Sequence, residues 1–224
     1  MSGVWLEELT WIEAKVLFDA DAVVVIPVGA ASKAHGAHLP LKTDALTARA
    51  LGQRLIECLP VVAAPVVGFG YYPAFTSFAG SQHLTADTFK AVMRELIASF
   101  TAHGVRRIAL INTGVSTEKP LDEVAAETGA LVLHMRLTGQ GADPLIEHKD
   151  GGHADERETS VVLALDSRSV RMDQLAPAAD FQESAATGDP TRASAFKGER
   201  LLAARIDDMV AALQRKWPDL GPKS

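Results

Sequence analysis

Residues 22–44 decide the fold, and they read AVVVIPVGAASKAHGAHLPLKTD. The first eight of these residues, 22–29, form a β-branched apolar run that ends in glycine, which is typical of a buried parallel strand followed by a turn. A polar loop comes next, and the hydroxyl of Thr43 predicts the N-cap of an amphipathic helix over residues 43–57. A buried strand, a loop at its carboxyl end and a helix are the repeating unit of an α/β fold.

The same alternation continues along the chain. Strands are predicted at residues 61–67, 106–111 and 131–135, and helices at 87–103 and 118–128. This order predicts an α/β three-layer sandwich with a mostly parallel central sheet. The pattern then loosens, with further helices expected at 154–165 and 195–214. Because no linker, repeat or low-complexity tract marks a boundary, we expect a single domain over residues 1–224.

Composition narrows the function classes. The 224 residues are 47% hydrophobic, which is enough for a sizeable core. The chain carries 22 basic and 28 acidic residues, for a net charge of −6, which argues against a nucleic-acid or anionic-membrane partner. Its longest apolar runs are too short to span a bilayer. A single cysteine, Cys58, forbids an internal disulfide, and the acidic N-terminus does not read as a signal peptide, so we expect a cytoplasmic protein.

The loop at the end of the first strand holds the strongest candidate site. In parallel sheets ligands bind outside the carboxyl ends of the strands, where residues 29–44, 68–81 and 112–118 are expected to lie. The first of these loops contains His35, His38 and Asp44 within ten residues. Imidazole and carboxylate groups are ligands that Zn²⁺ or Mn²⁺ accepts. The alternative is that Asp44 only complements the helix dipole while both histidines are solvated.

A second cluster lies at residues 150–160, which read DGGHADERETS and include His153 and Glu158. Its acids could simply occupy the first turn of a helix, where acids are favoured. The remaining candidates lie in or beside the other two loops, where we expect them to contact a substrate. They are Tyr71, Tyr72, Ser77, His83, Asn112 and Ser116. His83 could alternatively serve as a replacement metal ligand.

Together these segments resemble the creatininase family of amidohydrolases. The family carries PVG-x-x-EQHG-x-HLPL-x-TD and later HAG-x-x-ETS, and this chain has PVG, HGAHLPLKTD and HADERETS in the same order. Further matches are FGYYPAFTSFAGSQHL at 69–84, IALINTGVST at 108–117 and GDPTRASAFKG at 188–198. The resemblance covers residues 23–213 and implies a creatininase-like fold.

The resemblance also implies a metal site. Active family members look like hydrolases with two divalent ions bridged by an aspartate, which matches Asp44 here. Motif matching makes His35 a metal ligand and places Glu158 and His153 at active-site positions. We therefore expect one ion, of Zn, Mn or Fe, held by His35, Asp44 and Glu158, since three protein ligands and a water suffice for a catalytic site.

The chain departs from the family pattern at the residues that would hold the first of the two ions. The glutamate of EQHG matches Lys33 when counted back from His35, and Ser32 when counted forward from Gly29. The histidine of NGHGGN matches Gly114. Two ligands of the first metal are therefore absent, and we expect that site to be lost. A lysine ammonium at Lys33 would take over its charge beside the aspartate.

These expectations define three functional hypotheses. The first is an amidohydrolase that cleaves a C–N bond, other than a peptide bond, in a small amide or cyclic amide, with Glu158, His153 and Lys33 as catalytic residues. The second is a metal-independent enzyme of a specialised biosynthetic pathway, catalysing a condensation, lyase or isomerase step. The third is a non-catalytic metabolite-binding relative. The resemblance further implies a homo-oligomer, a hexamer. Trp5, Trp11 and the Tyr71-Tyr72 loop support it indirectly, since these aromatic residues would otherwise be exposed.

Overall fold

A computed structural model describes residues 3–221, and its centre is a five-stranded sheet in which every pair of neighbouring strands is parallel. The strand order is β1-β3-β2-β4-β5. The strands are β1 (Val4–Trp5), β2 (Val23–Val28), β3 (Val61–Ala63), β4 (Arg107–Asn112) and β5 (Leu131–His134). The α/β fold with a parallel sheet is thereby confirmed.

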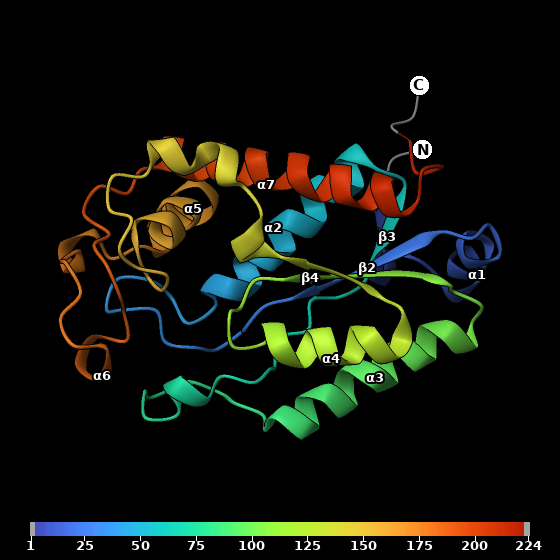
Figure 1. Ribbon diagram of the computed structural model, residues 1–224, viewed down its shortest axis with the longest axis horizontal. Coiled ribbons are helices and arrows are strands. Elements are labelled where there is room, and N and C mark those ends of the chain that lie inside the picture. The colour runs from blue at the N-terminus through green and yellow to red at the C-terminus, as the bar shows by residue number, and fades with distance from the viewer. Residues whose placement is uncertain (1–2, 222–224) are drawn as a thin grey trace.

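Helices cover both faces of this sheet (Figure 1). They are α1 (Trp11–Asp19), α2 (Thr43–Cys58), α3 (Ala86–Ala102), α4 (Glu118–Thr128), α5 (Glu156–Asp166), α6 (Phe181–Ser184) and α7 (Ala195–Lys216). One core lies between the sheet and α2, α5 and α7, and a second lies between the sheet and α3 and α4. The three-layer arrangement follows from these two cores. Within residues 3–221, no helix combines the length and the apolar character needed to cross a membrane.

The N-terminal strand β1 was not predicted, because two residues are too few to show a period. It pairs with β3 and places Trp5 against α2, where the indole Nε1 donates a hydrogen bond to Gln53 Oε1 at 2.8 Å. The Arg49 guanidinium lies 3.7 Å from the centre of the Trp5 ring. Trp5 is 5% exposed. The expectation that Trp5 would be exposed without a partner subunit was wrong, whereas Trp11 is 77% exposed.

The start of α2 also differs from the prediction. Thr43 is the first helical residue, and the N-cap position belongs to Lys42, whose side chain makes no capping bond. The Thr43 hydroxyl donates instead to the carbonyl of Pro40 at 2.7 Å. This bond closes a turn between the loop and the helix, so that Asp44 falls in the first turn of α2 and faces inward.

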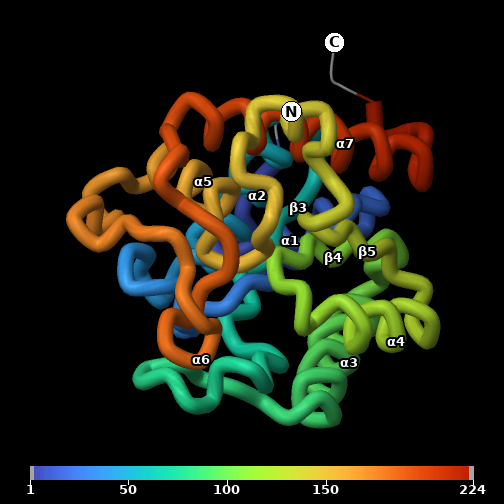
Figure 2. The backbone as a smooth tube through the Cα atoms, turned by 60° about the vertical axis from the view of Figure 1, so that its left-hand side comes forward, coloured from blue at the N-terminus to red at the C-terminus, as the bar shows by residue number. Residues whose placement is uncertain are grey.

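The carboxyl ends of the strands point toward the side of the molecule where α5 and α6 lie (Figure 1). Figure 2 turns this side toward the viewer and shows the loops after β2, β4 and β5 close to the segment that leads into α5. The candidate residues from distant parts of the sequence therefore meet at one end of the sheet.

Candidate functional site

The loop after β2 builds a buried charge cluster around Asp44. The Lys33 ammonium Nζ lies 2.6 Å from Asp44 Oδ2, and His35 Nε2 lies 3.0 Å from Asp44 Oδ1. The three side chains are at most 6% exposed. Ser32, the other residue that sequence counting placed opposite the aspartate, donates instead to the carbonyl of Gly80. The structure therefore places Lys33, and not Ser32, beside Asp44.

This cluster keeps Asp44 ionised. Burial raises the pKa of its carboxyl, but the charges of Lys33 and His35 more than offset burial and hold the pKa well below its usual range. The ammonium of Lys33 also lies 5.4 Å and 5.0 Å from the ring centres of Tyr72 and Phe75. Burial and the charge of Asp44 raise the pKa of the Tyr72 phenol, which stays protonated.

The start of α5 fixes the direction of Glu158, which periodicity could not predict. Asp155 caps the helix by accepting hydrogen bonds from the backbone N–H groups of Arg157 and Glu158 at 2.9 Å and 3.0 Å. Ala154 has a left-handed conformation, with φ of +52°, and its N–H donates to Glu158 Oε2 at 2.6 Å. This turn brings Glu158 Oε2 to 3.6 Å from His153 Nδ1.

Two histidines face each other across the site, with ring centres 4.5 Å apart. His35 Nδ1 lies 2.8 Å from the carbonyl oxygen of Lys33, and His153 Nε2 lies 2.8 Å from that of Ala34. A carbonyl only accepts, so each of these ring nitrogens carries the hydrogen. The second nitrogen of His35 lies 3.0 Å from Asp44 Oδ1, and that of His153 lies 3.6 Å from Glu158 Oε2.

His35, His153 and Glu158 place one ligand atom each within 4.8 Å of one another, a spacing that suits a metal ion. This set differs from the predicted set of His35, Asp44 and Glu158, because His153 takes the place of Asp44. Burial and the charge of His35 lower the pKa of His153 to about 2, so its imidazole is neutral. Burial raises the pKa of Glu158.

The loop after β4 is closed on itself around Asn112. The Asn112 amide donates to the carbonyl of Gly114 at 2.8 Å, and its oxygen accepts from the Thr117 hydroxyl at 2.7 Å and from the Gly114 N–H at 3.2 Å. Asn112 therefore holds the loop in shape, and its side-chain oxygen is already occupied by two hydrogen bonds within the loop. Gly114 offers no ligand atom.

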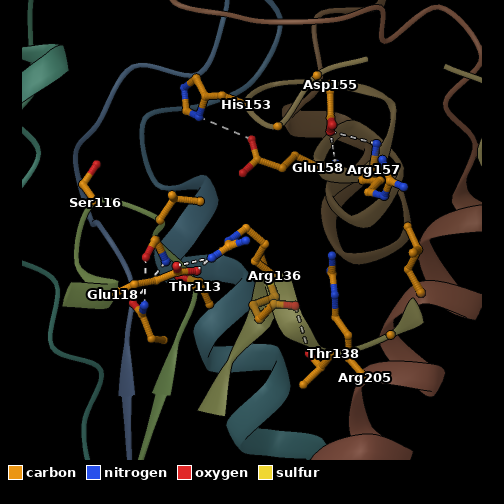
Figure 3. Close-up of a pocket in the computed structure, with 18 of the residues that line it drawn as sticks. Thr113, Ser116, Glu118, Arg136, Thr138, His153, Asp155, Arg157, Glu158 and Arg205 are labelled. Atoms are coloured by element: carbon orange, nitrogen blue, oxygen red, sulfur yellow. Dashed lines mark hydrogen bonds and ion pairs between the residues drawn. The ribbon is translucent and has the colours of Figure 1, made fainter. Parts of the chain in front are cut away.

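A cavity of about 360 Å³ opens from this site (Figure 3). Lys33, His153 and Glu158 line it, together with two of the predicted substrate residues, Asn112 and Ser116. The volume is near the lower end of the range for small-molecule pockets.

The other predicted substrate residues do not line this cavity. Tyr72 is buried behind Lys33. His83 is exposed, and its Nδ1 accepts from the Tyr72 backbone N–H at 3.0 Å, so it lies outside the group of possible metal ligands. Ser77 is exposed, and the Tyr71 ring packs against His83. The reason is that the segment folds into a short 3-10 helix that presents only Phe75 to the cavity.

Sequence reasoning missed three arginines that line the cavity, namely Arg136, Arg157 and Arg205. Only Arg205 gave a signal that could have been found. It stands four residues after Leu201 and four before Met209, in the apolar stripe of a helix, where a charged residue is unusual. A charge in such a stripe marks either a buried ion pair or a binding site.

Comparison with known proteins agrees with this geometry. The sequence pattern of the creatininase family, described as creatinine amidohydrolase, matches residues 7–213. The chain is 30% identical over 223 residues to a protein of Mycobacterium ulcerans (strain Agy99) named mycofactocin precursor peptide peptidase, covering 87% of this chain and 86% of that protein.

Solved structures show the same fold. A tryptophan-to-phenylalanine mutant of creatininase superposes with a TM-score of 0.81 at 24% identity, covering 96% of this chain and 99% of that one. A structure named creatininase Mn superposes with a TM-score of 0.79 at 22% identity, over the same shares of the two chains. The chain thus belongs to the creatininase family of amidohydrolases.

Proposed function

We propose that this protein hydrolyses an amide C–N bond of a small substrate with one divalent metal ion held by His35, His153 and Glu158. The orientation of the two histidines carries the proposal. Each donates its outer ring N–H to a backbone carbonyl, as metal-ligating histidines do. The inner nitrogen of His153 is a free acceptor, and that of His35, 3.0 Å from Asp44 Oδ1, would exchange its hydrogen for the ion. Three nitrogen and oxygen ligands with an open position are typical of a catalytic metal centre.

The protonation states fit a cation at this position. His153 Nδ1 and Glu158 Oε2 are both acceptors when the imidazole is neutral and the carboxyl ionised, yet they lie 3.6 Å apart. A positive charge between them removes this repulsion. Zn²⁺, Mn²⁺ and Fe²⁺ all accept this ligand set, and a structural relative is named for manganese.

A second ion is not part of the proposal. Lys33 Nζ already lies 2.6 Å from Asp44 Oδ2, and a divalent ion brought to the same carboxylate oxygen would be repelled by the ammonium. Gly114, at the position of the family histidine, supplies no ligand atom. The one-ion centre therefore follows from the replacement of two ligands by a cation and a glycine.

The chain's own residues complete the chemistry. A bound divalent cation supplies polarisation of the amide carbonyl and lowers the pKa of water. Asp44 holds the Lys33 ammonium at the cavity, where a fixed positive charge stabilises the negative charge that develops on the carbonyl oxygen. With one carboxylate oxygen on the ion, Glu158 would keep a second oxygen that can take a proton from the attacking water and return it to the leaving nitrogen.

The proposed bond class includes peptide bonds. The family description is creatinine amidohydrolase, and one relative is named a precursor peptide peptidase. Both names imply cleavage of an amide C–N bond. A cavity of about 360 Å³ has room for a small molecule or for the end of a peptide. We therefore propose cleavage of peptide bonds as well as of other amide C–N bonds.

A homo-oligomer is also part of the proposal. Three large apolar side chains on α1, Trp11, Ile12 and Val16, are between 59% and 77% exposed. A contiguous apolar face of this kind is usually covered by a partner. Light scattering on the purified protein should give a mass several times that of the 23.8 kDa chain, and a monomer would contradict this part.

Metal analysis tests the centre. After incubation with Mn²⁺ or Zn²⁺ and desalting, we expect the wild-type protein to retain about one equivalent, and His153→Ala and Glu158→Gln each to retain less than about a tenth, because two ligands hold a divalent ion weakly. His103→Ala, which changes an exposed histidine at the end of α3, should retain as much metal as the wild type.

Two other metal contents would contradict the proposed one-ion centre. Two equivalents in the wild type would show that Asp44 and Lys33 do not exclude a second ion. No retained metal in the wild type, with thermal stability unchanged by EDTA, would overturn the metal centre and favour a metal-independent enzyme built on Lys33, Asp44 and Glu158.

A further inference from the structure

Arg205 is a buried cation in the apolar stripe of α7. Its side chain is 5% exposed, and Leu201, Leu202, Ile206 and Met209 of the same helix are buried around its position. Burying a guanidinium is costly unless the charge is paired and hydrogen-bonded. The presence of Arg205 here therefore requires a partner for its charge.

No such partner is found in residues 3–221. Arg205 has no carboxylate oxygen within 4.0 Å, and its buried Nε has no hydrogen-bond partner. The two other arginines of the cavity are paired. Arg136 makes a two-bond contact with Glu118 at 2.6 Å and 2.9 Å, and Arg157 contacts Asp143 at 3.1 Å. Arg205 alone among these three keeps its donors for something that enters the cavity.

The fold holds this guanidinium in place. Figure 3 shows Arg205 extending from α7 toward the part of the cavity that Asp155 and Glu158 line. Its stem packs on Gly139, where an added Cβ would lie 2.7 Å from Arg205 Cγ. Gly139 itself has a φ of +81°, and its N–H donates to Asp208 Oδ2 at 2.8 Å. The position against Gly139 is thus built for the arginine stem.

Arg205 is charged at neutral pH. Burial lowers the pKa of its guanidinium to about 10, while the charges of Glu158 and Asp155 act in the opposite direction. The cavity therefore presents a cation near its inner carboxylates, and an entering group with one negative charge would be drawn to it.

We propose that Arg205 binds a carboxylate of the substrate, an inference that rests on the proposed amide hydrolysis. The substrate class is then an amide that carries a free carboxylate, such as an N-acyl amino acid or the C-terminal residue of a peptide. The carboxylate lies on Arg205 through the paired hydrogen bonds that guanidinium and carboxylate form, and the amide lies at Lys33, His153 and Glu158. A monoanion fits better than a phosphate because Asp155 and Glu158 also line the cavity.

The test compares two probes of the same size, N-acetylglycine, which has a carboxylate, and N-acetylglycinamide, which has a neutral carboxamide in its place, by isothermal titration of the full chain. We expect the wild type to bind the carboxylate at least about tenfold more tightly than the amide, since hydrogen bonds between two charged groups are stronger than those to a neutral group. Arg205→Met should reduce this preference to less than about twofold. Arg157→Met, which removes a paired arginine of the same cavity, should keep the preference.

Arg205→Met places an apolar side chain in an apolar stripe, so the variant is expected to fold, and its thermal unfolding checks this. Arg205→Lys, which keeps a positive charge but lacks the paired N–H donors of the guanidinium, should keep part of the preference. Equal binding of the two probes by the wild type, or an unchanged preference in Arg205→Met, would overturn the assignment. So would tighter binding of inorganic phosphate than of N-acetylglycine.

The outcome is separable from that of the proposed function. The preference is a ratio of binding affinities and not a rate of hydrolysis, so a carboxylate preference that depends on Arg205 stands even if metal analysis finds no ion. Conversely, one retained equivalent of metal with no carboxylate preference would support the proposed hydrolase and overturn only the proposal that its substrate carries a carboxylate.

Discussion

Lys33→Met is expected to lower the free energy of unfolding by about 3 kcal/mol at pH 7, because it leaves the buried carboxylate of Asp44 without its ammonium partner. The two side chains are 6% and 2% exposed and their charged atoms lie 2.6 Å apart. His35 alone then faces Asp44. Urea unfolding followed by circular dichroism measures the loss.

Lys15→Met is the matched control. Lys15 makes a contact of the same length with Asp19, but the two side chains are 63% and 61% exposed. An exposed pair of this kind contributes at most about 1 kcal/mol. Equal losses in the two variants would mean that the Lys33–Asp44 pair does not support the site.

The loss in Lys33→Met should also depend on pH. In the wild type the pKa of Asp44 is held below its usual range, so the carboxylate contributes stability that is present above the unfolded pKa of about 4 and is lost as the pH falls through the folded value. Without Lys33 that contribution is reduced, and burial favours the protonated form. The stability difference between variant and wild type should therefore narrow below about pH 4.

A double variant separates the pair from the surrounding packing. Asp44→Asn in the Lys33→Met background removes the unpaired charge, and we expect it to recover part of the stability that Lys33→Met loses. A further loss of the same size as in the single variant would show that the two side chains act independently. Metal retention in Lys33→Met should stay near one equivalent, since Lys33 lies outside the ligand group.

The fold could be predicted from sequence because its main elements carry strong patterns. The run of residues 23–28 is wholly buried as β2, and the amphipathic stripe at Phe89, Met93 and Ile97 gives α3. The strand β1 could not be predicted, because two residues carry no period and its pairing with β3 is a contact distant in sequence. The cap of α2 failed as a prediction because the Thr43 hydroxyl has a competing acceptor at Pro40.

The site was predictable only in part. Resemblance to a family predicted that four residues share one site, namely His35, Asp44, His153 and Glu158. Counting residues left Lys33 and Ser32 as equal alternatives for the position beside Asp44, and the structure shows that Lys33 occupies it. The side-chain direction of Glu158 depends on a left-handed residue and a cap just before it, which periodicity does not encode.

The loop residues Tyr71, Ser77 and His83 were misplaced for a related reason. Their expected position rested on the loop beginning near the carboxyl end of a strand, and a loop can turn most of its side chains away from that edge. Arg205, by contrast, lines the cavity although it was not predicted to do so. Its signal, a charge in an apolar helical stripe, was present in the sequence, but only the structure shows that the buried Nε of its guanidinium has no partner within residues 3–221.

The second large effect is expected at Gly198, which lets α7 lie against α5. A Cβ added there would lie 1.9 Å from the carbonyl oxygen of Ser160 and 2.4 Å from its carbonyl carbon. Both atoms are backbone, so no side-chain rotation relieves the overlap. Gly198→Ala must therefore push the two helices apart, and we expect it to cost about 3 kcal/mol or more, or to prevent cooperative unfolding altogether.

This spacing matters for function because the two helices carry the two ends of the proposed substrate site. Glu158 lies two residues before Ser160 on α5, and Arg205 lies on α7 within two turns of Gly198. The matched control is Gly141→Ala, at a glycine where an added Cβ has no atom within 4 Å, and its stability should stay within about 0.5 kcal/mol of the wild type. If Gly198→Ala unfolds at the same urea concentration as Gly141→Ala, the close approach of α5 and α7 is not what holds Glu158 and Arg205 at one cavity.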